Sequence, residues 1–113
     1  MKLKLSAIAI IMLGLLLGSV RQSAAQDATQ TLYKMKCQIC HGPDATGSVA
    51  GKKLAVKDFT SPEVQKQTDA ELLEVAKKGK NKMPAYGGKL TDNQLTELIK
   101  YMRDLAKAGP KGK

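Results

Sequence analysis

One short motif limits what this chain can fold into. The sequence CQICH, residues 37–41, places Cys37 and Cys40 three residues apart and His41 directly after them. The chain contains no other cysteine and no other histidine. Thiolate sulfur and imidazole nitrogen are ligands of soft and borderline metals, so their concentration within five residues indicates a metal or cofactor site.

Three uses of this motif other than cofactor attachment fit it poorly. A disulfide between Cys37 and Cys40 would join two residues of one helix, where the geometry is unfavourable and little of the fold would be fixed. A thioredoxin-like redox pair belongs beside a βαβ pattern, which the sequence lacks. A structural zinc site needs four ligands, so an aspartate would have to complete it, and His41 projects from a different side of the helix.

The spacing is that of covalent haem attachment, Cys-x-x-Cys-His. Two residues between Cys37 and Cys40 place both sulfurs along one helical edge, where each can form a thioether with a vinyl group of the haem. His41 is rotated by a further ~100° around the helix, which aims its imidazole at the iron. The motif therefore predicts one covalent haem c, with His41 as an axial ligand.

Residues 1–25 have the pattern of a secretory signal peptide. Two early lysines precede an apolar run over residues 5–17, and the small residues 23–25 follow at a typical cleavage position. The run is shorter than the roughly 20 residues of a spanning helix, and a glycine interrupts it, which disfavours a retained membrane anchor. We expect cleavage near Ala25 and export to the periplasm, leaving residues 26–113 as one domain.

The expected mature domain is basic and poor in aromatic residues. Loss of Lys2, Lys4 and Arg21 with the signal lowers the formal net charge from +9 to +6. A positive surface favours acidic partners, and the export signal opposes a nucleic-acid partner. With no tryptophan and one phenylalanine, so small a core would gain apolar bulk from a buried cofactor.

Helical periodicity predicts an all-α domain with about four short helices. Apolar residues at helical spacing cover about residues 28–39, and Ser61-Pro62 suits the first turn of a short helix. Capping boxes at Thr68 and Thr91 begin two further helices, each ended by a glycine. No segment shows the sustained alternation of a strand.

Two long loops remain between these helices, at residues 42–59 and 79–90. Loops of this length in a small domain usually wrap something. We therefore expect both loops to contribute to the cofactor site.

The second long loop contains the best candidate for a sixth iron ligand. Histidine with methionine is an established axial pair of haem, and the chain has no second histidine. Met35 shares a helix with His41, and Met102 falls on the apolar stripe of the last helix, where methionine usually fills a core. Met83 lies outside any helix, where Pro84 restricts its backbone and nearby glycines permit close approach to a flat cofactor. We predict Met83 as the distal ligand.

Together these features resemble the small class I cytochromes c of bacteria and algae. The resemblance rests on CQICHG, KMPAYGGKLT and LTELIKYMRDL, and it covers about residues 29–105. It implies a fold in which the first and last helices cross and the loops between them wrap the haem. In that fold Cys37 and Cys40 are the thioether sites. His41 is then the proximal ligand and Met83 the distal ligand.

The resemblance also implies contacts at the helix crossing. Tyr33 and Tyr101 match the family's aromatic residues there, and Leu98 belongs to the same contact. The chain departs from the family at Thr29, where many members have a glycine that lets the helices approach closely. The crossing is therefore either wider here or uses Ala28.

A second departure concerns the hydrogen bond that orients the proximal histidine. Many members have a proline whose neighbourhood supplies the carbonyl that accepts from Nδ1 of this histidine, which strengthens it as a ligand. Pro43 lies too near His41 to be that proline. We expect the acceptor within residues 47–51.

The resemblance and the ligand set imply a one-electron carrier rather than an enzyme. A haem with histidine and methionine ligands is coordinatively filled, and a neutral thioether stabilises ferrous iron. The alternative is a haem enzyme or a gas or peroxide sensor, in which Met83 detaches, but no distal catalytic group is evident. We expect redox partners of a respiratory or related chain, with acidic docking surfaces. The lysines expected to steer them are Lys34, Lys36, Lys52, Lys53, Lys80 and Lys82.

Overall fold

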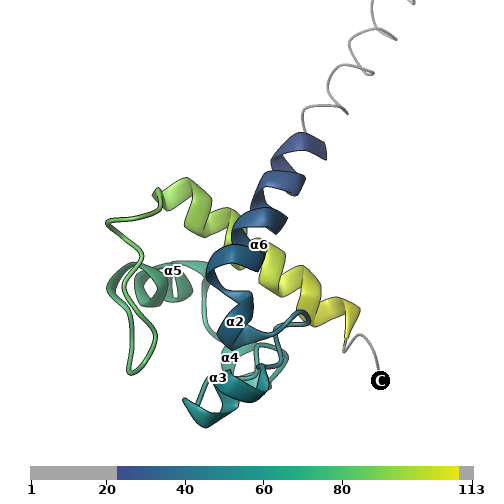
Figure 1. The fold of residues 1–113 in the computed structure, drawn as a ribbon, viewed down its shortest axis with the longest axis vertical. Coiled ribbons are helices and arrows are strands. Elements are labelled where there is room, and N and C mark those ends of the chain that lie inside the picture. The colour runs from purple at the N-terminus through teal and green to yellow at the C-terminus, as the bar shows by residue number, and fades with distance from the viewer. Residues whose placement is uncertain (1–22, 110–113) are drawn as a thin grey trace, which may run out of the picture.

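The computed structural model describes residues 23–109, and they form an all-α fold (Figure 1). A helix over residues 23–36, here called the N-terminal helix, comes first. The helices that follow are α2 (Gln38–His41), α3 (Val49–Lys53), α4 (Pro62–Gln65), α5 (Asp69–Lys78) and α6 (Asp92–Ala108). Within residues 23–109 there is no strand, and one isolated bridge pairs Lys80 with Met83. The predicted fold class is confirmed.

The predicted signal peptide is described only at its end, because residues 1–22 lie outside the described residues. In the part of the chain that the structure describes, no helix has the length and hydropathy needed to cross a bilayer.

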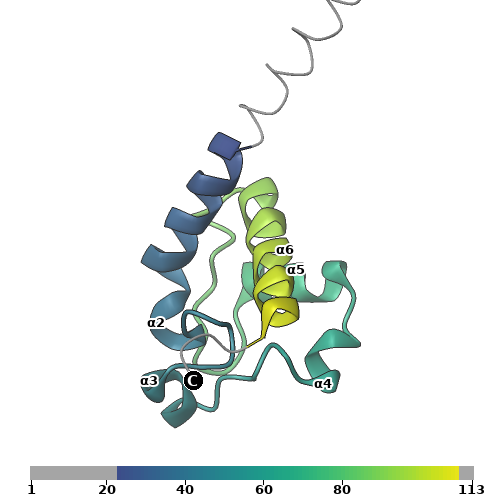
Figure 2. The ribbon, with the colours of Figure 1, turned by 90° about the vertical axis from the view of Figure 1, so that its right-hand side faces the viewer.

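The N-terminal helix and α6 cross each other, as Figures 1 and 2 show. Tyr33 and Tyr101 meet at the crossing, with ring centroids 5.1 Å apart and planes inclined by 60°. Such edge-to-face pairs stabilise beyond the area they bury. Tyr33 is 1% exposed and Leu98 is buried beside this pair in the same core. The aromatic contact implied by the family resemblance is therefore confirmed.

The family resemblance places Thr29 at the position where many members have a glycine. Thr29 is half-buried and lines a groove of about 420 Å³ between the crossing helices, together with Glu97 of α6. Its hydroxyl donates to the carbonyl of Ala25 in its own helix over 3.1 Å. Ala28 is exposed, so it does not take over the role of the missing glycine.

Both long helices in the second half begin at the predicted capping boxes. The hydroxyl of Thr68 accepts from the N–H of Glu71, whose carboxylate accepts in return from the N–H of Thr68. Thr91 and Gln94 make the same reciprocal pair at the start of α6. These caps satisfy N–H groups that a helix start leaves without partners. α5 packs on α6.

The core lies where α5 packs on α6 and where the N-terminal helix crosses it, and Val64 of α4 belongs to the same cluster. α6 contributes five of its members at helical spacing, which is why its sequence shows a continuous apolar stripe. The buried apolar residues are Tyr33, Ala45, Phe59, Val64, Leu72, Ala76, Leu95, Leu98, Ile99, Met102 and Leu105.

Two local features differ from the sequence prediction. The first helix was expected over residues 28–39, but it is interrupted at Cys37 and helical structure resumes in α2. The prediction of an uninterrupted loop over residues 42–59 is wrong, because α3 forms within it. Ser48 caps this short helix by accepting from the N–H of Gly51, a signal too short to register as helical periodicity.

Candidate cofactor site

The interruption at Cys37 sets the geometry of the CQICH motif. The N–H of Cys37 still donates to the carbonyl of Tyr33 over 2.9 Å, which completes the N-terminal helix. The N–H groups of Cys40 and His41 both donate to the carbonyl of Cys37, over 3.2 and 2.9 Å. The motif therefore forms a single tightened turn.

The chain after the motif folds back onto α2 and fixes its end. All four carbonyls of α2 are paired, by the N–H groups of Gly42, Gly47 and Ser48 and by the hydroxyl of Ser48. The hydroxyl of Tyr33 in turn donates to the carbonyl of Gly42. Helix ends leave carbonyls without partners inside the helix. Here these contacts supply the partners, and they fix the end of α2 where His41 lies.

Gly51 allows α3 to lie directly against the motif. A Cβ atom at Gly51 would stand 1.8 Å from the carbonyl oxygen of Cys40, far inside contact distance. α2 and α3 can therefore pack backbone to backbone only with glycine at this position. Sequence reasoning did not single out Gly51. The available signal was its place three residues after the capping Ser48.

We expect Gly51→Ala to destabilise the fold strongly. The added methyl group must push α3 away from Cys40, and such overpacking typically costs about 1–3 kcal/mol or more of unfolding free energy. Chemical denaturation followed by circular dichroism measures the change. Gly88→Ala is the matched control, because a Cβ atom there meets nothing within 4 Å, and its effect should stay within about 0.5 kcal/mol. Equal effects of the two substitutions would contradict this account of α3.

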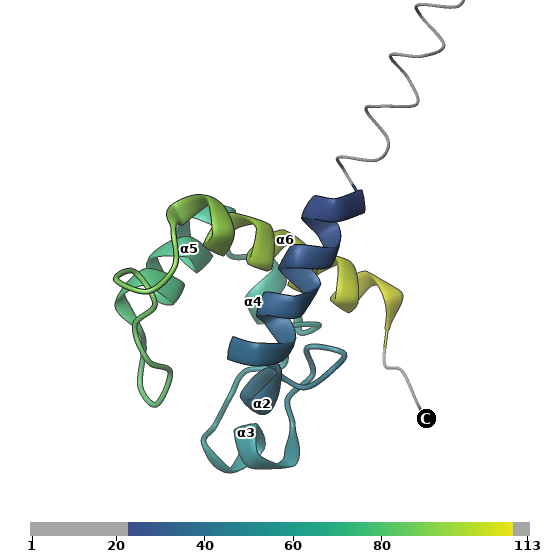
Figure 3. The ribbon, with the colours of Figure 1, turned by 45° about the horizontal axis from the view of Figure 1, so that its top comes forward.

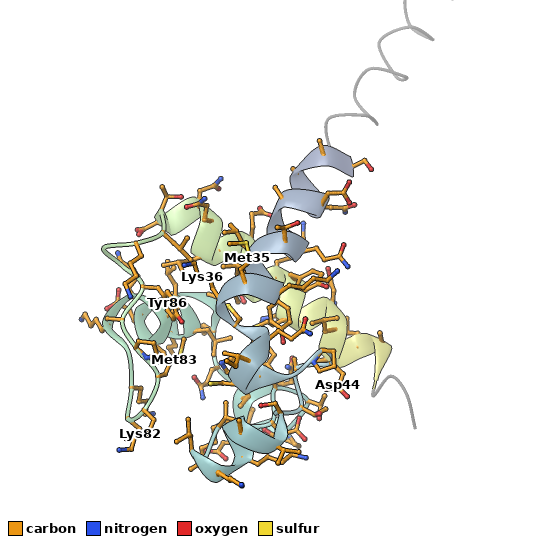
Figure 4. The ribbon with its side chains drawn as sticks, in the orientation of Figure 1. Met35, Lys36, Asp44, Lys82, Met83 and Tyr86 are labelled. Atoms are coloured by element: carbon orange, nitrogen blue, oxygen red, sulfur yellow. The ribbon has the colours of Figure 1, made fainter. Side chains whose placement is uncertain are left out.

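A largely apolar cavity of about 340 Å³ brings the four predicted site residues together. Cys37, Cys40 and His41 line it from α2 and the interruption before it, and Met83 lines it from the loop of residues 79–90. Figure 4 shows Met83 on that loop, across from α2. The apolar residues of the lining are Ile39, Leu54, Ala55, Val56, Phe59, Val64, Leu72, Val75, Ala76, Pro84, Ile99 and Met102.

The lining comes from almost every part of the described chain. Figure 3 shows α2 and α3 at one end of the molecule, and α5 with the loop of residues 79–90 on another side. Both long loops contribute residues to the cavity. Ile39 and Leu54 line it although they are 73% and 46% exposed. Exposed apolar surface gathered around a cavity in this way marks a binding site.

The three methionines considered as ligands have different positions. Met35 is 67% exposed and is absent from the cavity lining. This position agrees with the sequence prediction that Met35 is not an iron ligand. Met102 is buried in the core, as predicted, but it also lines the cavity. Met83 is half-buried and is the only one of the three on a loop.

Gly79 shapes the loop that contains Met83. It ends α5 with a φ angle of +75°, and a Cβ atom there would lie 2.6 Å from the carbonyl oxygen of Met83. The sequence suggested that glycines in this loop serve close approach to a cofactor. In the structure Gly79 instead permits close approach of the loop to itself, and Gly88 faces open space.

Burial favours the neutral forms of Cys37 and His41. It raises the pKa of the Cys37 thiol to about 11 and lowers the pKa of the His41 imidazole, because desolvation disfavours the charged form of each group. A neutral imidazole keeps a nitrogen lone pair for a metal.

Nδ1 of His41 is buried and has no hydrogen-bond partner. The acceptor expected within residues 47–51 is therefore not found. Within that segment the Ser48 hydroxyl bonds to α2, and the carbonyls of Ser48 and Gly51 accept from N–H groups of α3 and the residues after it. The hydrogen bond that would orient the imidazole is therefore not made by the described residues.

The predicted steering lysines divide into two groups. All six are exposed, and those that line the cavity are Lys36, Lys80 and Lys82. The others, Lys34, Lys52 and Lys53, lie away from it. Lys57 also lines the cavity and pairs with Glu63 over 3.3 Å, and sequence reasoning missed it.

Similar proteins are c-type cytochromes. The chain is 32% identical over 78 residues to cytochrome c6 of Parathermosynechococcus lividus, covering 69% of this chain and 87% of that protein. It is 32% identical over 91 residues to the menaquinol:cytochrome c reductase cytochrome c subunit of Bacillus subtilis (strain 168). That match covers 77% of this chain and 32% of the subunit, so the chain spans about a third of the subunit's length. The solved structure of the KustC0563 c-type cytochrome has a TM-score of 0.63 at 28% identity, covering 67% of this chain and 94% of that one.

The fold, the CQICH turn and these likenesses define a small class I cytochrome c. Residues 24–102 match the family described as cytochrome C oxidase, cbb3-type, subunit III, and the chain belongs to that family. The family resemblance inferred from the sequence is confirmed.

Cytochromes c contain covalently bound haem c, and the residues present fit this group. Cys37, Cys40 and His41 line an apolar cavity together with Met83. Apolar walls suit a porphyrin ring, and the donor set of sulfur and imidazole suits attachment and iron coordination. Among residues 23–109, no three His, Cys, Asp or Glu side chains converge to hold a bare metal ion.

Proposed function

We propose that this protein is an exported one-electron carrier with one covalent haem c. The observation that supports this most strongly is the meeting of Cys37, Cys40, His41 and Met83 at one apolar cavity. Haem, when bound, supplies the reversible Fe(III)/Fe(II) couple. The sequence pattern of residues 1–25 supports export to the periplasm, with cleavage near Ala25. Intact-mass measurement of the periplasmic protein tests both the cleavage and the single haem.

Each of the four residues has a distinct role in this proposal. The thiols of Cys37 and Cys40 attach the porphyrin as thioethers, and the neutral imidazole of His41 binds the iron. The Met83 thioether completes the coordination from the loop and favours the ferrous state. The apolar walls exclude water, which also favours the form of lower charge.

The absorption spectra of the oxidised and reduced protein test this proposal. A low-spin c-type spectrum with a near-infrared sulfur-to-iron charge-transfer band in the ferric state is expected. Carbon monoxide added to the reduced protein separates the carrier from the alternative, a haem enzyme or sensor in which Met83 detaches. An unchanged spectrum supports the carrier, and rapid formation of a carbonyl complex would favour the alternative.

The lysines at the cavity should steer acidic redox partners. The proposal predicts that the triple substitution Lys36→Gln/Lys80→Gln/Lys82→Gln slows oxidation of the ferrous protein by the anion hexacyanoferrate(III), by roughly tenfold at low ionic strength. The wild-type rate should fall steeply as salt screens these charges. Stopped-flow spectroscopy over a series of salt concentrations measures both effects.

A matched triple substitution on other exposed lysines separates local steering from net charge. The control is Lys66→Gln/Lys100→Gln/Lys107→Gln, none of which lines the cavity. It removes the same charge and should change the rate much less. A cationic cobalt oxidant should respond in the opposite direction. Rates with hexacyanoferrate that are independent of salt, or equal in both variants, would refute steering.

A further inference from the structure

The loop of residues 79–90, here called the methionine loop, is attached mainly to one side of the cavity. Lys80 and Met83 exchange two backbone hydrogen bonds of 3.2 and 3.0 Å within the loop. The N–H groups of Tyr86 and Gly87 donate to two carbonyls of α5, over 2.9 and 3.1 Å. None of these contacts ties the loop to the element that carries the CQICH motif.

One side-chain hydrogen bond spans the two sides. The hydroxyl of Tyr86 donates to the backbone carbonyl of Lys36 over 3.0 Å, across 50 positions of sequence. Among the hydrogen bonds of residues 23–109, it is the only one that joins the methionine loop to residues 23–59. Figure 4 shows Tyr86 beside Lys36, on the same loop as Met83.

The interruption of the helix at Cys37 makes the acceptor available. In a continuous α-helix, the carbonyl of Lys36 would accept from the N–H of Cys40 four residues later. That N–H donates to the carbonyl of Cys37 instead. The Lys36 carbonyl is thereby released from the helix, and it accepts from Tyr86.

The ring of Tyr86 is well held in this position. It is half-buried, packs against the core and lines the cavity. The ammonium of Lys89 lies 5.8 Å from its ring centroid, within cation–π range. Burial raises the pKa of the hydroxyl, which therefore keeps its proton as a donor at neutral pH.

We propose that the Tyr86 hydroxyl latches the methionine loop to the N-terminal helix and limits how often the loop opens. Tyr86 is thus a positioning residue, acting on Met83 three residues earlier through the shared backbone. The consequence for coordination rests on the proposed function, in which Met83 is an axial ligand. One net hydrogen bond shifts an opening equilibrium by roughly three- to tenfold.

The test compares Tyr86→Phe with Tyr101→Phe in the haem-containing protein. Both substitutions remove one hydroxyl and keep the ring, but the Tyr101 hydroxyl makes no hydrogen bond among the described residues. Two rates are measured: amide hydrogen exchange at Met83, Tyr86 and Gly87, and cyanide binding to the ferric protein. Cyanide must wait for the loop to open and Met83 to leave. Both rates should rise roughly three- to tenfold in Tyr86→Phe and stay at the wild-type value in Tyr101→Phe.

Several outcomes would overturn the latch. Unchanged loop exchange and cyanide binding in Tyr86→Phe would do so. An equal rise in both variants would also do so, because it would reflect general loosening. A wild-type ferric protein without the near-infrared band would refute Met83 ligation, and with it the proposed function. Loop exchange would then still decide the latch, since it does not depend on the ligand.

Discussion

The double substitution Cys37→Ala/Cys40→Ala is expected to leave a polypeptide with little helix. Without the proposed thioethers the haem would not be retained, and the apolar walls of the cavity would be exposed to water in a small domain. A domain of this size has only about 4–13 kcal/mol of unfolding free energy in total. Far-UV circular dichroism of the purified variant measures the loss.

The control for this experiment keeps the haem and perturbs the core. Leu105→Ala removes a buried side chain of α6 and should cost about 2–5 kcal/mol, lowering the melting temperature while the native helical signal remains below it. If the double cysteine variant instead has the full helical signal of the wild type, then the fold does not depend on the cofactor. The proposed role of the haem as core would then be wrong.

Met83→Ala is expected to have the largest effect on the electronic properties of the site. The near-infrared band should disappear from the ferric spectrum, and the reduced protein should bind carbon monoxide stoichiometrically, because one axial position is released. The reduction potential should fall by about 0.1 V, a fraction of the ~0.8 V over which axial ligands set haem potentials. Spectra and a redox titration measure all three changes.

Met102→Leu is the matched control, because Met102 is the other methionine that lines the cavity. Leucine has a similar volume, so the substitution should cost less than about 1.5 kcal/mol of stability. The band and the potential should remain close to wild type. The reverse pattern, with the band lost in Met102→Leu and kept in Met83→Ala, would identify Met102 as the ligand.

Patterns spanning several residues predicted the fold well. The capping boxes at Thr68 and Thr91 and the stripe along α6 combine local signals that agree with the tertiary packing. The Tyr33–Tyr101 contact is between residues distant in sequence, and it was predictable only through the family resemblance. α3 escaped prediction because five residues that include Gly51 carry no helical period.

Features that depend on long-range backbone contacts could not be read from the sequence. The hydrogen bond from Tyr86 exists because the interruption of the helix at Cys37 releases the carbonyl of Lys36. Neither segment has a sequence pattern that predicts this contact with the other. The acceptor expected for His41 within residues 47–51 was wrong for a related reason. The hydroxyl and the N–H of Ser48 in that segment both donate to carbonyls at the end of α2. Only the folded chain reveals this contact.

The compactness of the CQICH turn separates two stages of maturation. Cys37, Cys40 and His41 lie within five consecutive positions, whereas Met83 follows 42 positions after His41. A modifying enzyme therefore needs only a short unfolded stretch to join the porphyrin to the chain. In the proposed function, Met83 would reach the haem only after the long segment between residues 41 and 83 has closed. Attachment at the CQICH turn would therefore precede completion of the fold.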